Sequence, residues 1–315
     1  EVGRYKNPEL WLAERQRDGN GNIVYRRMAE SSTLAQSTYT KGDRRNYLEA
    51  NLIYETLLNE KHRIGGLVKY YQQQISRTDL NKYSDIIWAI PKRNLALSGR
   101  VTYGFMDRYL AEFNFGYTGS ENFEKGERFG FFPAIAGGWV ISEEPFIKKN
   151  LPWLDMFKIR YSYGEVGNDI IPDDNRFPYL TQLSTQGNGY NWGEYGSNHT
   201  PGYGITILGS SNLTWERAKK HNLGIDWNLF NSKITGTVDF FKDNRSKIFI
   251  RRNNMPYSTG LEDLRPWVNL GKMESKGVDG NIAFMQKVND INFTLRANMT
   301  YAKNEVLESD EAANE

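Results

Sequence analysis

The sequence predicts an all-β protein, an antiparallel up-and-down transmembrane β-barrel of which this chain holds only a part. Three observations lead to this fold class: long strands that alternate apolar and polar residues, an aromatic content of 14% without a long apolar run, and connections that alternate between short and long. Strands of an outer-membrane barrel turn apolar residues to lipid and polar residues to the interior, so their hydropathy averages out along the chain.

The clearest pair of strands is a hairpin over residues 94–118, with a short turn at 106–108. Apolar or aromatic residues recur at every second position on both sides of this turn. Because successive side chains of a strand point to opposite faces, each strand has one apolar and one polar face. Each strand is long enough to cross a bilayer at a tilt, which takes roughly 9–11 residues, whereas strands of globular proteins average about 5–6.

The same alternation predicts further strands along the chain. We expect strands near 22–32, 45–57, 62–74, 94–105, 109–118, 131–142, 156–164, 214–229, 234–246, 273–286 and 291–303. We expect Phe113, Phe115, Trp227 and Leu295 to face lipid, and Glu112, Asn114, Asp226 and Arg296 to face the interior. Between two strands, Ser142 is a candidate cap for a short helical turn that has Glu143 and Glu144 in its first turn and Pro145 near its start.

The connections alternate in length. Short ones are expected near 58–61, 106–108, 230–233 and 287–290, and long ones at 75–93, 119–130, 165–213 and 247–272. One connection on the short side, 143–155, is longer. Alternate connections of a meander lie at the same end, so the long ones share one end, as do the external loops of outer-membrane barrels. Residues 1–315 therefore form part of one barrel domain, with 165–213 and 247–272 as extracellular loops.

Composition limits the function classes. The chain has no Cys, so disulfide and thiol chemistry are excluded, and its net charge of +2 gives no sign of nucleic-acid binding. The three histidines, His62, His199 and His221, fall in no metal-binding or catalytic motif, and no nucleophile elbow or phosphate-binding glycine loop occurs. We therefore expect neither an enzyme nor a bound cofactor.

Four stretches resemble the C-terminal barrel half of SusC/RagA-type TonB-dependent transporters. They are residues 107–148 (DRYLAEFNFGYTGSENFEKGERFGFFPAIAGGWVISEEPFIK), 154–169 (LDMFKIRYSYGEVGND), 212–249 (NLTWERAKKHNLGIDWNLFNSKITGTVDFFKDNRSKIF) and 269–287 (NLGKMESKGVDGNIAFMQK). The resemblance implies energy-dependent import of an oligosaccharide or a peptide across the outer membrane of a Gram-negative, Bacteroidetes-type bacterium.

The resemblance also implies further parts and partners. Such transporters combine a 22-stranded barrel and an internal plug with a SusD-like surface lipoprotein, and they couple to TonB-ExbB-ExbD through an N-terminal part. We expect this chain to be a piece of such a protein, about half of the barrel without the plug. An open sheet edge in lipid leaves backbone groups unpaired, so we expect the piece alone to be inactive.

The loop 165–213 is the best candidate for ligand binding. It carries Asn188, Tyr190, Asn191, Trp192 and Tyr195, with Asn198 and Tyr203 further on, interleaved with glycines. Aromatic faces cover apolar surface of a sugar or peptide, and amides fix its orientation. The alternative is that these aromatics pack within the loop or against the lipoprotein. We expect no strand within 183–205.

A second loop feature is a cluster of oxygen donors, Asp169, Asp173, Asp174 and Asn175. Calcium takes 6 to 8 oxygen ligands, and such a loop could supply several of them. The spacing matches no EF-hand, however, and a solvated acidic loop is the simpler interpretation. We therefore predict no metal site.

Two other protein classes compete with a transporter. One is a β-rich surface carbohydrate-binding or adhesion module without transport, and the other is a glycoside-binding or glycosidase β-domain with 165–213 as its cleft. Both predict shorter strands and turns of mixed length at each end. Both would also leave the face with Tyr109, Phe113, Phe115 and Tyr117 in water, where a patch of this kind promotes aggregation. The sequence favours the barrel.

Overall fold

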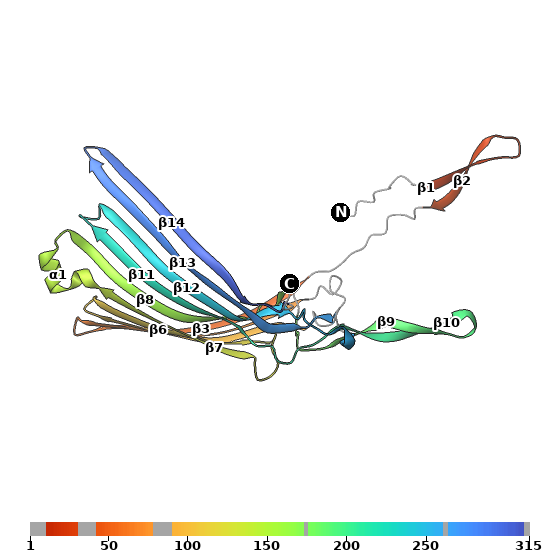
Figure 1. Cartoon of the computed structure of the whole chain (residues 1–315), viewed down its shortest axis with the longest axis horizontal. Helices are drawn as coiled ribbons and strands as arrows, with labels where there is room; N and C mark the ends of the chain where they lie inside the picture. Colours follow the sequence, from red (N-terminus) through yellow and green to blue (C-terminus); the bar gives the residue numbers. More distant parts are fainter. Residues whose placement is uncertain (1–10, 31–41, 78–89, 173–175, 261–263, 312–315) are drawn as a thin grey trace.

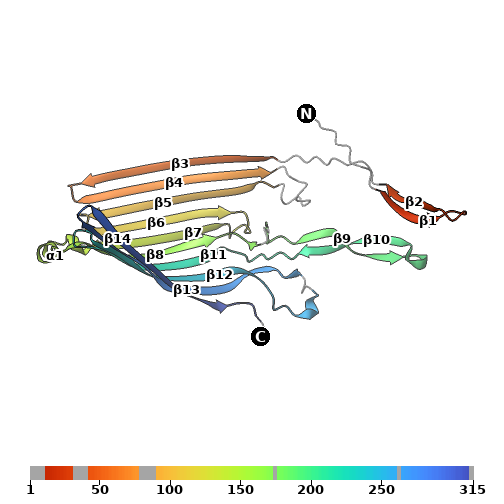
Figure 2. The same cartoon turned by 90° about the horizontal axis from the view of Figure 1, so that it is seen from above.

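The computed structural model describes residues 11–30, 42–77, 90–172, 176–260 and 264–311. Its main element is a ten-stranded antiparallel sheet with the strand order β14-β13-β12-β11-β8-β7-β6-β5-β4-β3 (Figure 1, Figure 2). The strands are β3 (Asp43–Leu58), β4 (His62–Arg77), β5 (Lys92–Phe105), β6 (Tyr109–Ser120), β7 (Phe129–Val140), β8 (Leu154–Asn168), β11 (Glu216–Leu229), β12 (Ile234–Arg251), β13 (Trp267–Val288) and β14 (Ile291–Glu308).

Most strands are longer than the sequence predicted. The strand expected at 156–164 runs from Leu154 to Asn168, and the one expected at 273–286 runs from Trp267 to Val288. The connection expected at 247–272 therefore shrinks to 252–266. The backbone pairing continues beyond the residues whose alternation predicted each strand, as in the pair of Arg251 with Trp267.

The connections divide between the two ends as predicted. Tight turns join β3 to β4, β5 to β6, β11 to β12 and β13 to β14, all at the end of the sheet where α1 (Pro145–Asn150) lies (Figure 1). Asn59 and Glu60, like Met106 and Asp107, have positive φ at two successive positions. A type I′ turn needs this conformation, and its twist matches that of the paired strands. We call this the turn end and the opposite end the loop end.

The predicted cap of α1 is wrong. Residues Ile141–Glu143 form a 3₁₀ turn, and the residue before the helix is Glu144, whose side chain makes no capping bond. Pro145 occupies the first turn, where its fixed φ and missing N–H are tolerated, and this sets the start of the helix. Ser142 is buried, and its Oγ has no hydrogen-bond partner among the described residues. No helix in the described ranges has the length and apolarity to span a bilayer.

One predicted wall strand lies outside the sheet. The strand expected at 22–32 is β2 (Ile23–Glu30), which pairs with β1 (Trp11–Arg17) in a separate two-stranded sheet. The described wall therefore has ten strands and not the eleven that we counted from the sequence. The turn of this hairpin is closed by Asp18, whose carboxylate accepts hydrogen bonds from the backbone N–H groups of Asn20 and Asn22. The bond from Asn22 is the main cause of the lowered pKa of Asp18.

The register gives the sheet two chemically different faces. Residues directly opposite each other on neighbouring strands share a face, and Phe113 lies opposite Val101 and Ile135. Following such pairs across the sheet places Phe113, Phe115, Trp227 and Leu295 on one face and Glu112, Asn114, Asp226 and Arg296 on the other. The predicted division is confirmed. We call these the apolar face and the polar face.

Aromatic pairs mark two levels on the apolar face. Tyr109 stacks on Trp139 near the turn end, with ring centroids 6.3 Å apart, and Tyr117 stacks on Phe129 near the loop end, at 5.1 Å. The two tyrosines lie on β6 about 27 Å apart along the strand, since an antiparallel strand rises about 3.4 Å per residue. At a tilt near 40° this is roughly 21 Å along the barrel axis, close to the ~25 Å apolar band of outer-membrane barrels.

The buried core lies at the loop end. Six side chains form it, and we call them the mouth cluster: Phe123, Ile171, Leu213, Trp215, Phe249 and Trp267. The Trp215 ring lies 5.3 Å from that of Phe123, and its Nε1 donates to the backbone oxygen of Arg128. The cluster joins the connection between β6 and β7 to both ends of the connection between β8 and β11.

Candidate functional site

The connection between β8 and β11 contains a hairpin that the sequence did not reveal. Strands β9 (Gln182–Trp192) and β10 (Asn198–Ile207) pair antiparallel, so the expectation of no strand within 183–205 is wrong. This β9–β10 hairpin projects away from the loop end of the sheet (Figure 1, Figure 2). Its glycines interrupt any two-residue pattern, which removed the usual sequence signal.

These glycines are needed for the close approach of the two strands. A Cβ on Gly187 would lie 2.5 Å from the backbone nitrogen of Gly204, and one on Gly202 would lie 2.2 Å from the carbonyl oxygen of Asn188. The register also shifts at three places along the pair. Backbone pairing with glycines at the contacts therefore forms this hairpin without a conventional strand sequence.

The five predicted ligand residues all lie on β9 or at the tip of the hairpin. Tyr190 and Trp192 are separated by two positions on β9 and share one face, and Asn191 points to the other face. Tyr190, Trp192 and Tyr195 are 73%, 54% and 98% exposed, and Asn188 is also exposed. The hairpin thus presents an exposed aromatic pair on one face rather than five convergent side chains.

Side-chain hydrogen bonds across the hairpin hold two of the five residues. The Nε1 of Trp192 donates to the Oγ1 of Thr200 at 2.9 Å, which fixes the indole plane. The Oδ1 of Asn191 lies 2.6 Å from the Nδ1 of His199 on the opposite face. Of the two faces, that of Tyr190 and Trp192 offers open ring surface for stacking.

The base of the hairpin is anchored at the sheet. Leu213, which is 1% exposed, packs in the mouth cluster, and Thr214 exchanges two backbone hydrogen bonds with the side chain of Asn269 on β13, each 2.8 Å long. At the other end of the connection, Asp169 accepts a hydrogen bond from the Oγ of Ser120 at 2.6 Å. A rigid base with an exposed hairpin is a common arrangement for binding loops.

The proposed oxygen-donor cluster is only partly described. Asp169 uses its carboxylate to accept the hydrogen bond of Ser120, and Asn122 donates to its backbone oxygen. Asp173, Asp174 and Asn175 lie outside the described residues. Within the described part of the chain, no group of three or more His, Cys, Asp and Glu side chains is placed to hold a metal ion.

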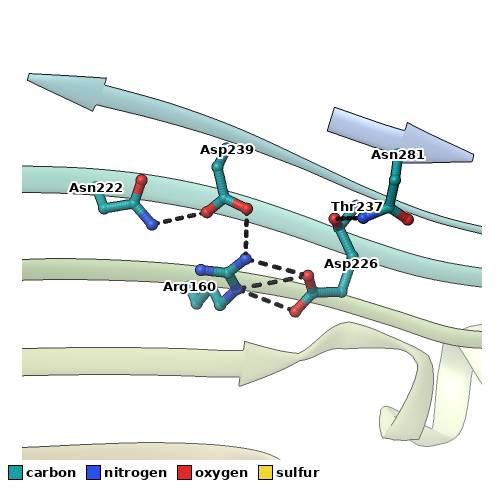
Figure 3. A network of polar contacts seen from close by, with 6 residues as sticks. All are labelled: Arg160, Asn222, Asp226, Thr237, Asp239 and Asn281. Carbon is teal, nitrogen blue, oxygen red and sulfur yellow. Dashed lines mark hydrogen bonds and ion pairs between the residues drawn. The ribbon is translucent and has the colours of Figure 1, made fainter. Parts of the chain in front are cut away.

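A polar network that the sequence did not reveal lies on the polar face of β8, β11 and β12 (Figure 3). Arg160 donates from Nε to Asp226 at 3.1 Å and from Nη2 to Asp239 at 2.7 Å. Asn222 donates to the other oxygen of Asp239, also at 2.7 Å. The sequence predicted that Asp226 faces the interior. That this network joins residues of three strands follows only from the register of the sheet.

One cavity of about 460 Å³ opens at the loop ends of β3 to β7. Part of its lining is one row of directly opposite residues, Gln72, Leu95, Gly119 and Phe129. This row belongs to the apolar face. The cavity therefore lies outside the barrel wall, away from a path through the interior.

Comparison with known proteins identifies the family. The model of the TonB dependent receptor-like β-barrel matches residues 4–314. The TonB-dependent receptor SusC of Bacteroides thetaiotaomicron is 30% identical over 224 residues, which are 69% of this chain and 21% of SusC. A TonB-dependent receptor of Formosa agariphila is 29% identical over 277 residues, 81% of this chain and 25% of that receptor. The chain thus spans about a quarter of the length of these curated relatives.

Solved structures share the fold. The RagAB peptide importer in its closed-closed state superposes with a TM-score of 0.68 at 20% identity, covering 87% of this chain and 31% of the other. The siderophore receptor PirA of Pseudomonas aeruginosa superposes with a TM-score of 0.54 at 12% identity, covering 85% and 44%. The resemblance stated from the sequence is confirmed, and this family consists of transporters, not of enzymes. The chain belongs to the TonB-dependent receptor β-barrel family, whose barrels lie in the Gram-negative outer membrane.

Proposed function

We propose that this chain forms part of the barrel wall and the extracellular loops of a SusC/RagA-like transporter. The complete protein imports an oligosaccharide or a peptide, works with a SusD-like lipoprotein, and draws energy from TonB-ExbB-ExbD. The observation that best supports this proposal is the sheet itself. It has an apolar band between two aromatic levels, a polar face with paired charges, and tight turns at one end with its longest connections at the other.

The loop end is the extracellular end in this proposal, because outer-membrane barrels have short periplasmic turns and longer external loops. The loops 165–213 and 247–272 of the sequence prediction are then external, the second of them reduced to 252–266. Tyr190 and Trp192 on the β9–β10 hairpin recognise the ligand by stacking, while Asn188, Asn191 and Tyr195 border them. Exposed aromatic rings on a projecting hairpin equally suit contact with the lipoprotein.

Deletion of residues 183–205 in the complete protein tests this role. Leu183 pairs with Ile205, and the Oγ1 of Thr206 donates to the backbone oxygen of Gln182 at 3.3 Å. The two ends left by the deletion therefore already lie side by side, and the barrel should assemble. We expect growth on the cognate nutrient to be lost while heat-modifiable migration of the barrel is unchanged.

A double substitution separates the contribution of the aromatic side chains from that of the hairpin backbone. The double change Tyr190→Ser and Trp192→Ser removes the exposed aromatic pair and leaves the backbone pairing intact. Tyr203→Ser is the matched control. Tyr203 is a similarly exposed aromatic residue of the same hairpin, at 78%, and is not one of the five predicted ligand residues. Lost uptake with retained lipoprotein co-purification indicates ligand contact, and loss of both indicates lipoprotein contact. Normal uptake in the double variant would remove these residues from the site.

A further inference from the structure

A row of basic side chains crosses the apolar face on the loop-end side of its apolar residues. His221 on β11 lies directly opposite Lys242 on β12, Lys242 lies opposite Lys276 on β13, and Lys276 lies opposite Lys303 on β14. Because directly opposite residues share a face, all four point to the same side. We call Lys242, Lys276 and Lys303 the lysine row.

The lysine row lies at the edge of the apolar band. On each of its three strands, the neighbouring residue of the same face toward the turn end is apolar or aromatic: Phe240, Val278 and Tyr301. Toward the loop end the next residues are Asn244, Glu274 and Glu305. The row is therefore the first charged position beyond the part of the wall that lies in lipid hydrocarbon.

The charges of the row are not matched within the sheet. Like charges directly opposite on neighbouring strands repel each other. Glu274 is shared between two lysines, at 2.8 Å from Lys242 and 3.0 Å from Lys276, and Lys303 reaches Glu305 at only 3.8 Å. The lysine side chains remain 49%, 54% and 61% exposed. The three lysines thus share two carboxylates, Glu274 and Glu305, and their side chains remain about half exposed.

We propose that the lysine row binds the phosphate group of an anionic lipid in the outer leaflet of the membrane. Lysine binds phosphate as a point charge, and its long apolar stem can lie along the apolar band while the ammonium group reaches the headgroup level. A phosphate placed between Lys276 and Lys303 would relieve the repulsion that Glu274 leaves. The proposal rests on the membrane position of the wall and is independent of what is transported.

The site is confined to one part of the wall. The three lysines lie on adjacent strands, β12 to β14. The lipid would therefore occupy a defined place beside these strands. Aromatic neighbours such as Tyr301 suit the boundary between headgroups and acyl chains.

Titration of the detergent-solubilised complete protein tests the proposal. The probes are phosphatidic acid, phosphatidylcholine and inorganic phosphate, and the readout is the midpoint of heat-modifiable migration. We expect phosphatidic acid to raise this midpoint, since a ligand that binds only the folded state stabilises it. The variant with Lys242→Gln, Lys276→Gln and Lys303→Gln should need about ten-fold more phosphatidic acid for the same effect, and added salt should weaken binding to the wild type.

The control is Lys220→Gln. Lys220 is a lysine of similar exposure, 52%, which faces the polar side of β11 and pairs with Asp243 at 3.8 Å. The Lys220→Gln variant should respond to phosphatidic acid as the wild type does. Should the triple variant not assemble, Lys276→Gln should weaken the response and Lys276→Arg should retain it. An unchanged response in the lysine-row variants, or equal loss in Lys220→Gln, would overturn the proposal, and an equal effect of inorganic phosphate would replace the lipid by a free anion.

Discussion

Arg160 and Asp239 form an ion pair across an intervening strand. Arg160 lies on β8 and Asp239 on β12, and the residue between them in the same row is Gly224 on β11. Because glycine has no side chain, the guanidinium crosses β11 and donates to Asp239 at 2.7 Å (Figure 3). A Cβ at position 224 would lie 2.4 Å from the Cζ of Arg160. One glycine therefore determines which strands this charge connects.

Gly224→Ala should displace the guanidinium of Arg160 and break its bond to Asp239. Arg160 is a flexible side chain and remains partly exposed, so we expect a modest loss of about 1 kcal/mol or less. The heat-modifiable migration of the complete barrel measures this loss of stability. Gly116→Ala is the control, because Gly116 also lies within a strand on the polar face and a Cβ there meets no atom within 4 Å. Equal effects of the two changes would contradict this role of Gly224.

Phe115→Arg should be far more costly than Asn114→Arg. Phe115 lies on the apolar face and stacks on Phe131 at 6.1 Å, so an arginine there enters lipid at a cost of roughly 2–4 kcal/mol near the midplane. Asn114→Arg loses the hydrogen bond from Arg100, which is worth about 0.5–1.5 kcal/mol, but remains on the polar face. Equilibrium unfolding in detergent or lipid compares them, and equal losses would refute the assignment of faces.

Cysteine labelling can determine which end is outside. Ser197 lies by the tip of the β9–β10 hairpin, and Ser232 lies in the turn between β11 and β12. Each can be replaced by Cys in turn, because the native chain has no Cys. Both serines are exposed. In whole cells, an impermeant thiol reagent should label Ser197→Cys and leave Ser232→Cys unlabelled until the cells are opened. The reverse pattern would invert the predicted topology.

The turn end should lose stability in acid through Glu144. Its carboxylate accepts hydrogen bonds from the hydroxyl of Tyr109 at 2.6 Å and from the Nε1 of Trp139 at 3.1 Å, and Arg108 lies 3.7 Å away. The bond from Tyr109, followed by that from Trp139, lowers the pKa of Glu144 below its ordinary value of 4.5.

A lowered carboxyl pKa stabilises the folded state above the unfolded pKa, and this contribution is lost as the pH falls through the folded pKa. We therefore expect the thermal midpoint to fall below pH 4.5 in the wild type. Glu144→Gln should be less stable at neutral pH and should show a flatter profile between pH 6 and 3. The same slope in both proteins would mean that other groups control the acid response.

The location of the exposed aromatic residues could be predicted from the sequence, but the hairpin that carries them could not. Aromatic and amide residues in a long loop on a rigid wall predicted where exposed rings gather, and Tyr190 and Trp192 do lie there. The pairing of β9 with β10 was not predictable, because it depends on close backbone contacts at Gly187 and Gly202 and not on a hydrophobic pattern. The bond between Asn191 and His199, which joins residues of opposite strands, likewise depends on that register.

The sequence by itself determined the strands of the ten-stranded sheet, its two faces and the end at which the longest connections lie. The two-residue alternation of side chains and the lengths of the turns carry this information locally. The tertiary structure alone decided which residues become neighbours across the sheet. The pair of Arg160 and Asp239, the lysine row and the mouth cluster join residues far apart in the chain, and the strand register, which sets these contacts, is a property of the assembled sheet.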